Sequence, residues 1–150
     1  MQRTTRQSMQ RLDTTPDGRP RFSVESHSVA VSVVPLYLAE QSDPAQSRYV
    51  WSYTVTIDNG GGETVQLRER SWRIIDGNGH VEHVRGSGVV GEQPILQPGD
   101  TFEYTSGCPL TTPSGIMEGS YVMARENGET FDVTIPTFSL DRPDENRVLN

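Results

Sequence analysis

Short runs of β-branched and aromatic residues, separated by Gly, Pro, Asn and Asp, are the feature that most constrains the fold of this chain. The clearest run covers residues 49–57, where apolar residues at odd positions alternate with Ser and Thr. Successive side chains of a strand point to opposite faces, so the odd positions share one face, and we expect Trp51 at the centre of the core. No stretch of the sequence keeps a helical period. The pattern therefore predicts an all-β protein.

Six more runs of this kind predict strands at 29–38, 64–75, 80–84, 101–105, 121–125 and 130–135. Turn sequences at 76–79 and 126–129 predict two hairpins. Within 29–38 the apolar residues change phase at Pro35, which predicts a β-bulge and an edge strand, because proline donates no ladder hydrogen bond. About seven short strands fit a β-sandwich of two sheets, and a small barrel is the alternative.

The N-terminal residues differ from the rest of the chain in charge and pattern. Residues 1–25 are predicted to form a basic, flexible and disordered extension, and residues 26–150 a single domain that begins between Phe22 and Ser28. The first 22 residues carry five arginines and two aspartates, show no periodicity and end in turn and breaker residues. We interpret this segment as a solvated arm.

Charge and apolar content restrict the partners of this chain. Residues 23–150 hold 8 basic and 18 acidic side chains, a net charge of −10. A body this acidic repels a phosphate backbone, so we expect no nucleic-acid partner. Arg70 and Arg73 flank Trp72 and are expected to point outward from a core aromatic residue. No apolar run reaches the ~18–20 residues of a membrane span, so no membrane partner is expected.

The segment Gly86-Ser87-Gly88-Val89-Val90-Gly91 has the glycine spacing of dinucleotide-binding loops. Such a loop works where a strand leads directly into a helix, whose N-terminus then holds the pyrophosphate. Pro94 and Pro98 stop any helix that begins after Gly91. The sequence therefore predicts that this segment is not a dinucleotide fingerprint.

Two interpretations of these glycines remain. Gly86, Gly88 and Gly91 permit a tight connection between strands, with apolar neighbours that pack or face a partner. In the other interpretation, the amides of these three glycines and the neighbouring Arg85 form an anion-binding loop without a helix. These four residues are the candidate binding site.

Other chemistry is poorly supported. His80 and His83 are three positions apart on a strand and point to opposite faces, and the carboxylates are scattered, so we expect no metal and no cofactor. Ser106 and Ser114 lack the context of a nucleophile elbow. Cys108 has no placed basic partner, and as a lone cysteine it fits a reducing cytoplasm. We expect no catalytic residues and no enzymatic activity.

The ordered motifs of the chain resemble those of the ApaG family. They extend from residue 26 to residue 140 and comprise RYVWSYTVTI (48–57), Trp72 with DGNG (76–79), GSGVVGEQP (86–94), PG (98–99), YTSG (104–107), GxMxGxYxM (115–123) and IPxFxL (135–140).

The resemblance implies an immunoglobulin-like, fibronectin type III-like β-sandwich in a small, cytoplasmic bacterial protein. It also implies a link to cobalt and magnesium resistance and to neighbours that handle diadenosine tetraphosphate. Similar domains in eukaryotic F-box and polymerase-interacting proteins imply a role in binding partners.

Three functions follow. The first is a non-catalytic module that presents its sheet faces and the 84–97 loop to an unidentified protein partner. The alternative is a binder of phosphate or nucleotide, such as diadenosine tetraphosphate or a magnesium nucleotide, through the Gly86–Gly91 loop and Arg85. The third is a homodimer formed by pairing of edge strands.

Overall fold

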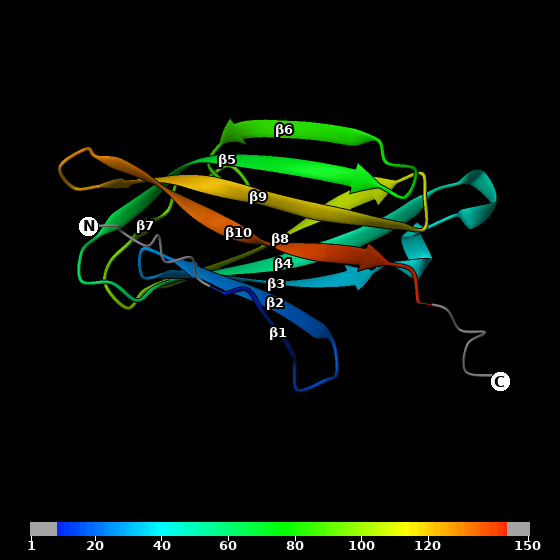
Figure 1. Cartoon of the computed structure of the whole chain (residues 1–150), viewed down its shortest axis with the longest axis horizontal. Coiled ribbons are helices and arrows are strands. Elements are labelled where there is room, and N and C mark those ends of the chain that lie inside the picture. The colour runs from blue at the N-terminus through cyan, green and yellow to red at the C-terminus, as the bar shows by residue number, and fades with distance from the viewer. Residues whose placement is uncertain (1–8, 144–150) are drawn as a thin grey trace, which may run out of the picture.

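The computed structural model describes residues 9–143, and these residues form two antiparallel sheets packed face to face (Figure 1). Ten strands lie in this part of the chain: β1 (Arg11–Thr14), β2 (Pro20–Ser26), β3 (Val29–Tyr37), β4 (Tyr49–Asn59), β5 (Val65–Asp76), β6 (Val81–Ser87), β7 (Ile95–Leu96), β8 (Thr101–Leu110), β9 (Ser114–Arg125) and β10 (Thr130–Asp141). The first sheet has the order β1-β2-β3-β4-β8. The second has the order β10-β9-β5-β6, with the short β7 paired to β5. The predicted all-β sandwich is confirmed.

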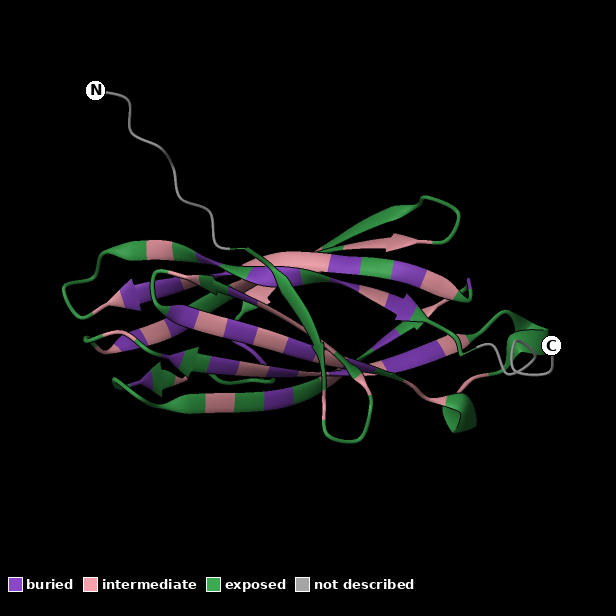
Figure 2. Ribbon diagram, turned by 60° about the horizontal axis from the view of Figure 1, so that its bottom comes forward, coloured by how far each residue is buried: buried purple, intermediate pink, exposed green. Residues whose placement is uncertain are grey.

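The core lies between the two sheets and follows the alternation of the strands (Figure 2). Trp51, Val55 and Ile57 of β4 are at most 1% exposed, whereas the intervening Ser and Thr face the outside. Trp51 also donates a hydrogen bond from Nε1 to the backbone oxygen of Asp141 in the other sheet, at 3.0 Å. The predicted core position of Trp51 is confirmed.

An aromatic cluster joins the two sheets. The ring of Tyr53 in β4 lies 5.3 Å from Trp72 in β5 and 5.8 Å from Phe138 in β10. Trp72 and Phe138 meet edge to face at 6.1 Å, and Phe22 of β2 lies 6.3 Å from Phe138. Edge-to-face aromatic pairs contribute about 0.5–1.5 kcal/mol each beyond the area they bury. The cluster therefore ties strands from both ends of the sequence to one centre.

All seven predicted strands are present, and the described residues contain three more: β1, β2 and β7. The prediction that residues 1–25 form a flexible extension is wrong for β1 and for most of β2, which extend the first sheet. All four residues of β1 are exposed, so its sequence has no apolar alternation from which a strand could be predicted. Residues 1–8 lie outside the described part of the chain.

The N-terminal strands also connect the first sheet to the second. The side-chain amide of Gln10 donates to the backbone oxygen of Thr137 at 2.6 Å and accepts from the Thr137 N–H at 2.8 Å. Thr137 lies at a register shift in β10, the edge strand of the second sheet. A hydroxyl of β2 adds a further link, because Ser26 Oγ accepts from the N–H of Thr134 at 3.1 Å. The sandwich is thus closed on its β10 side.

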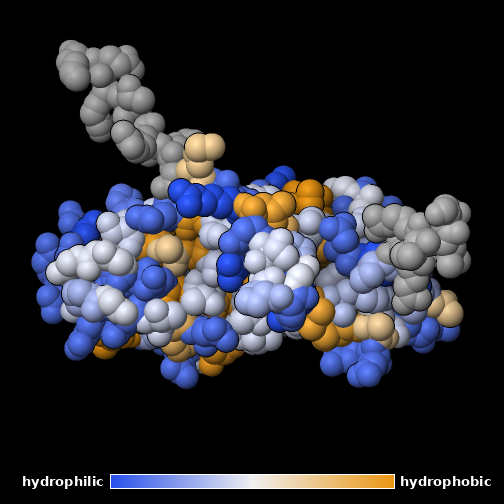
Figure 3. Space-filling model, turned by 90° about the horizontal axis from the view of Figure 1, so that it is seen from below, coloured by the Kyte–Doolittle hydropathy of each residue, from blue (hydrophilic) through white to orange (hydrophobic). Residues whose placement is uncertain are grey.

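From the side of the β1–β2 hairpin, the surface shows small hydrophobic patches separated by polar side chains (Figure 3).

The predicted bulge at Pro35 is wrong, and so is the predicted edge position of this strand, because β3 lies between β2 and β4. The register of β3 with β4 runs without a shift from Val29 to Tyr37, and Pro35 is buried while its neighbours Val34 and Leu36 face outward. Pro35 lies on the same inner face of the strand as Val31 and Val33. Pairing of β3 with β2 ends at Val33, so Pro35 has a ladder neighbour only on the β4 side, as its missing N–H allows.

Replacing Gln10 with Ala removes two hydrogen bonds to the β10 edge. We expect the Gln10→Ala variant to lose about 1 kcal/mol of unfolding free energy, because the Thr137 peptide returns to water. Urea denaturation measures this loss. Gln41→Ala is the matched control, since the Gln41 side chain is exposed and makes no hydrogen bond within the described residues. Equal stability of wild type and both variants would contradict the role given to Gln10.

Four ionisable side chains are buried between the sheets in their neutral form. Burial raises the pKa of Tyr53, Tyr104 and Tyr121, and the hydroxyls of the last two lie 2.5 Å apart. Burial also raises the pKa of the Cys108 thiol to about 11. These groups hold their protons more tightly in the folded chain than in the unfolded chain.

The stability of this protein should therefore fall in alkaline solution. Groups with a raised pKa contribute stability that is complete below their unfolded values, 9.0 for Cys and 10.0 for Tyr, and that is lost as the pH rises above them. We expect the urea midpoint to drop between about pH 9 and pH 11. Tyr104→Phe should flatten this dependence. A midpoint that is constant over that range would refute the prediction.

Candidate functional site

The glycine segment connects β6 to β7 through a tight turn. Gly88 N–H donates to the backbone oxygen of Arg68 at 2.8 Å. Val89 and Glu92 exchange two backbone hydrogen bonds of 2.8 and 2.9 Å around Val90 and Gly91. Both of these turn residues have positive φ, 43° and 82°. The described chain continues into β7, so the predicted absence of a helix after Gly91 is confirmed.

Close approach of the backbone explains why glycine stands at position 88. Its φ of +62° is a left-handed value that favours glycine, and a Cβ placed there would collide with the backbone oxygen of Glu92. Val89 beside it is 1% exposed and packs in the core. The segment is therefore anchored by one buried side chain and closed by its own backbone.

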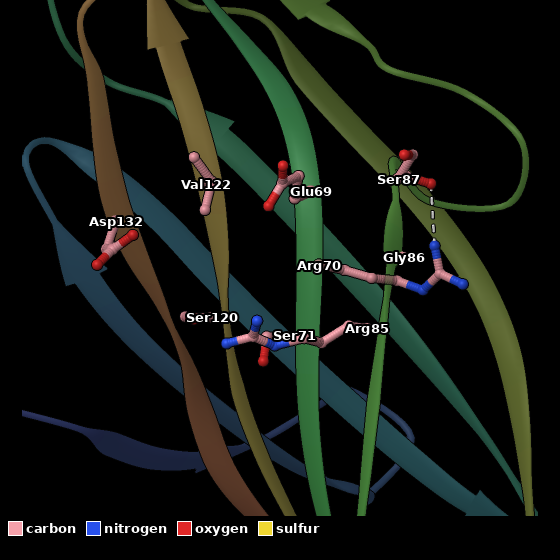
Figure 4. A pocket seen from close by; sticks show the side chains of 9 residues that line it. All are labelled: Glu69, Arg70, Ser71, Arg85, Gly86, Ser87, Ser120, Val122 and Asp132. Atoms are coloured by element: carbon pink, nitrogen blue, oxygen red, sulfur yellow. Dashed lines mark hydrogen bonds between the residues drawn. The ribbon is translucent and has the colours of Figure 1, made fainter.

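Arg70 of β5 holds the segment from the other side. Its side chain passes over Gly86 of β6, where a Cβ would lie 2.7 Å from Nη1 (Figure 4). Nη1 then donates to the backbone oxygens of Ser87 at 3.0 Å and Gly88 at 2.9 Å. Gly86, which has no side chain, thus leaves room for the Arg70 side chain. Arg70 in turn donates hydrogen bonds to two carbonyl groups at the end of the edge strand. We call residues 86–92 with Arg70 the clamped loop.

Arg85 takes the opposite direction. It lies on the outer face of the second sheet, the face turned away from the core, and extends across β5 toward β9 (Figure 4). There it lines a shallow depression of about 430 Å³. The depression is also lined by Glu69, Ser71, Ser120, Val122 and Asp132, together with parts of Arg70, Gly86 and Ser87.

The four candidate site residues do not converge on one point. Gly86 belongs to the β6 ladder, Gly88 is buried, Gly91 is exposed at the turn and Arg85 faces the outer side of the sheet. The amides of Gly88 and Val89 are bonded to backbone oxygens. An anion-binding loop at these residues stays a prediction, and its free donors would be limited to the tip of the turn.

The structure corrects the direction expected for Arg70. Arg70 and Trp72 are two positions apart on β5 and share the inner face, where Arg70 is opposite the buried Tyr121. The period of two in a strand could have shown this, because only Arg73 is out of phase with Trp72. Sequence reasoning therefore missed the residue that holds the loop.

In the part of the chain that the structure describes, histidines and carboxylates do not gather in a metal-binding group. His80 Nδ1 lies 3.6 Å from Asp76 Oδ2, and His83 faces outward from β6. Residues 9–143 contain no cluster of three or more His, Cys, Asp or Glu side chains able to hold an ion. No helix in the same part of the chain is long and apolar enough to cross a membrane.

These features define a small two-sheet β-sandwich with a clamped glycine loop at one edge. Residues 39–125 match the family model described as the ApaG domain, which is more than half of the chain. Relatives called Protein ApaG from Brucella canis and Mesorhizobium japonicum are 57% and 58% identical to it over 129 residues, 86% of this chain and 99% of theirs. A crystal structure from Bordetella pertussis superimposes with a TM-score of 0.75 at 53% identity, covering 79% of this chain and 95% of the other. The chain belongs to the ApaG family.

Arg70→Met tests the clamp, since methionine keeps the apolar stem and removes both hydrogen bonds. We expect a loss of about 1–2 kcal/mol in unfolding free energy, because the Ser87 and Gly88 carbonyls lose their partner. Amide hydrogen exchange at Val89 and Glu92 should become several-fold faster. Arg68→Met is the matched control, since the Arg68 side chain is exposed and bonds only the side chain of Gln66, and the substitution keeps the backbone oxygen that accepts from Gly88. Loop exchange equal in the two variants would argue against a clamp.

Proposed function

We propose that this protein is a non-catalytic module that binds a protein partner through its clamped loop and the adjoining β7. The observation that carries the proposal is a pair of exposed apolar side chains held on a fixed backbone. Val90 at the turn is 55% exposed and Ile95 in β7 is 62% exposed. Both belong to one short connection that the core and Arg70 fix in place.

Rigidity makes such a surface suited to recognition. Ordering a loop on binding opposes association, and a loop that is already ordered avoids that loss. Here the order comes from the buried Val89, the two Val89–Glu92 hydrogen bonds and the Arg70 clamp. Exposed apolar side chains on a rigid element are typical of contact surfaces.

The phosphate or nucleotide alternative has less geometric support. Arg85 points away from the loop, and the Gly88 and Val89 amides already have acceptors. The link to cobalt and magnesium handling and the cytoplasmic location both stay predictions that depend on the family resemblance and on composition.

Site-specific photocrosslinking in living cells tests the proposal. A photoreactive residue at position 90 should capture a discrete partner protein, because Val90 stands at the centre of the proposed contact. The same residue at position 36 is the control, since Leu36 is 41% exposed on the first sheet, away from the loop. Adding the Ile95→Asp substitution to the position-90 probe should abolish the capture.

Two outcomes would count against the proposal. One is the same set of products from positions 90 and 36. The other is capture that is insensitive to Ile95→Asp. Titration with ATP and magnesium, followed by amide NMR shifts of residues 86–92, examines the alternative separately: shifts at millimolar ligand would favour nucleotide binding.

A further inference from the structure

The outer face of the second sheet carries an ordered pattern of side chains across β6, β5, β9 and β10. At one end an apolar row crosses the strands, because Ile75 pairs with Val81 on one side and with Ile116 on the other. Val81 is 46% exposed and Ile116 is 41% exposed. Two exposed β-branched residues and the half-buried Ile75 between them thus form an apolar row at one end of a face that is mostly polar elsewhere.

The next positions along the strands carry charge. Arg73 of β5 forms an ion pair with Glu118 of β9 at 2.8 Å, and His83 of β6 pairs with Arg73 in register. Two residues further along, Ser71 and Ser120 face each other at the floor of the depression, with Arg85 lying across them.

Basic and acidic groups occupy opposite halves of this face. Arg73 and Arg85 lie on β5 and β6, whereas Glu118 and Asp132 lie on β9 and β10. Glu69 of β5 is the exception. Neither Arg85 nor Asp132 forms an ion pair within residues 9–143. Two copies of this face are therefore complementary in charge when β5 and β6 of one copy lie on β9 and β10 of the other.

We propose that a second copy of this chain docks on this face about a twofold axis that runs parallel to the strands, between β5 and β9. This inference uses a different surface from the clamped loop and does not depend on the proposed function. The axis places β6 of one copy on β10 of the other, and β5 on β9.

Three contacts that this axis creates are favourable. Ile75 meets Ile116 of the second copy and Ile116 meets Ile75, so the two apolar rows overlap at these residues. The Arg73–Glu118 pair of one copy lies on the same pair of the other in the opposite direction. Each arginine therefore lies over a glutamate of the second copy. The backbone of Arg85 comes opposite Thr134 of the second copy, with Asp132 diagonally beside it two residues along β10, and this contact occurs twice.

A twofold axis across the strands at the same centre gives a worse match, because it brings the two Arg85 guanidinium groups together. Sheets that pack face to face keep their strands within about 30° of each other, which an axis parallel to the strands satisfies. Charge complementarity therefore selects the parallel axis.

The size of the face sets the strength of the dimer. Four strands spaced about 4.8 Å apart, over the seven residues of β6, cover roughly 400–450 Å². Stable interfaces bury about 800 Å² on each partner. The dimer is thus a weak one that forms at high protein concentration.

Charge reversal across the axis tests the proposal by sedimentation equilibrium from about 10 μM to about 1 mM protein, a range suited to weak association. The wild type should show a concentration-dependent dimer. Arg85→Asp and Asp132→Arg should each raise its dissociation constant roughly tenfold or more, because each places like charges together across the axis. An equimolar mixture of the two single variants should associate again, since every reversed contact then joins opposite charges.

Glu103→Arg is the control, because Glu103 is exposed on the first sheet and this change should leave the dimer intact. Equal thermal midpoints show that all variants are folded. A wild type that stays monomeric up to about 1 mM overturns the proposal. So does a dimer that survives both single reversals, which would indicate pairing of edge strands instead.

Discussion

Contact between the two sheets at the Tyr53–Trp72–Phe138 cluster is the constraint on which the rest of the structure depends. The three rings come from β4, β5 and β10, so no single hairpin could bury them alone. Their packing sets which face of each strand is inner and which is outer. Once Trp72 points inward, Arg70 is also on the inner face, and its length lets it reach the sheet edge over Gly86. The position of the clamped loop is therefore a consequence of core packing.

Different hydrogen bonds satisfy the backbone on the two lateral sides of the sandwich. On the β10 side, Gln10 and Ser26 add hydrogen bonds that join the sheets. On the β6 side, the edge strand ends in a loop whose carbonyls are held by an arginine from the neighbouring strand. Free strand edges invite pairing with other chains, and both devices occupy backbone groups that such pairing would use. The β6 side, which ends in the clamped loop, is also the side on which we place the partner.

Much of this fold could be predicted from the sequence, because alternation in β4 and turn residues such as those at 76–79 are local signals. The strands that escaped prediction lack such signals: β1 is exposed throughout and β7 has only two residues. The apolar residues on both sides of Pro35 predicted a bulge. In the structure Pro35 is itself buried in the regular alternation of β3, so no bulge is needed. The glycines of the loop stand out in the sequence by their spacing, but the role of Gly86 depends on Arg70, which is 16 positions away. Contacts of that kind become visible only when strands are paired in register.

The pairing of Gln10 with Thr137 has a wider consequence. A side-chain amide has the same donor and acceptor groups as a backbone peptide, so one glutamine here does the work of an additional strand residue at an irregular edge. The N–H and C=O of Thr137 are thereby withheld from pairing with the edge strand of another chain. The N-terminal arm thus does two things at once: β1 extends the first sheet, and Gln10 beside it occupies the irregular edge of the second.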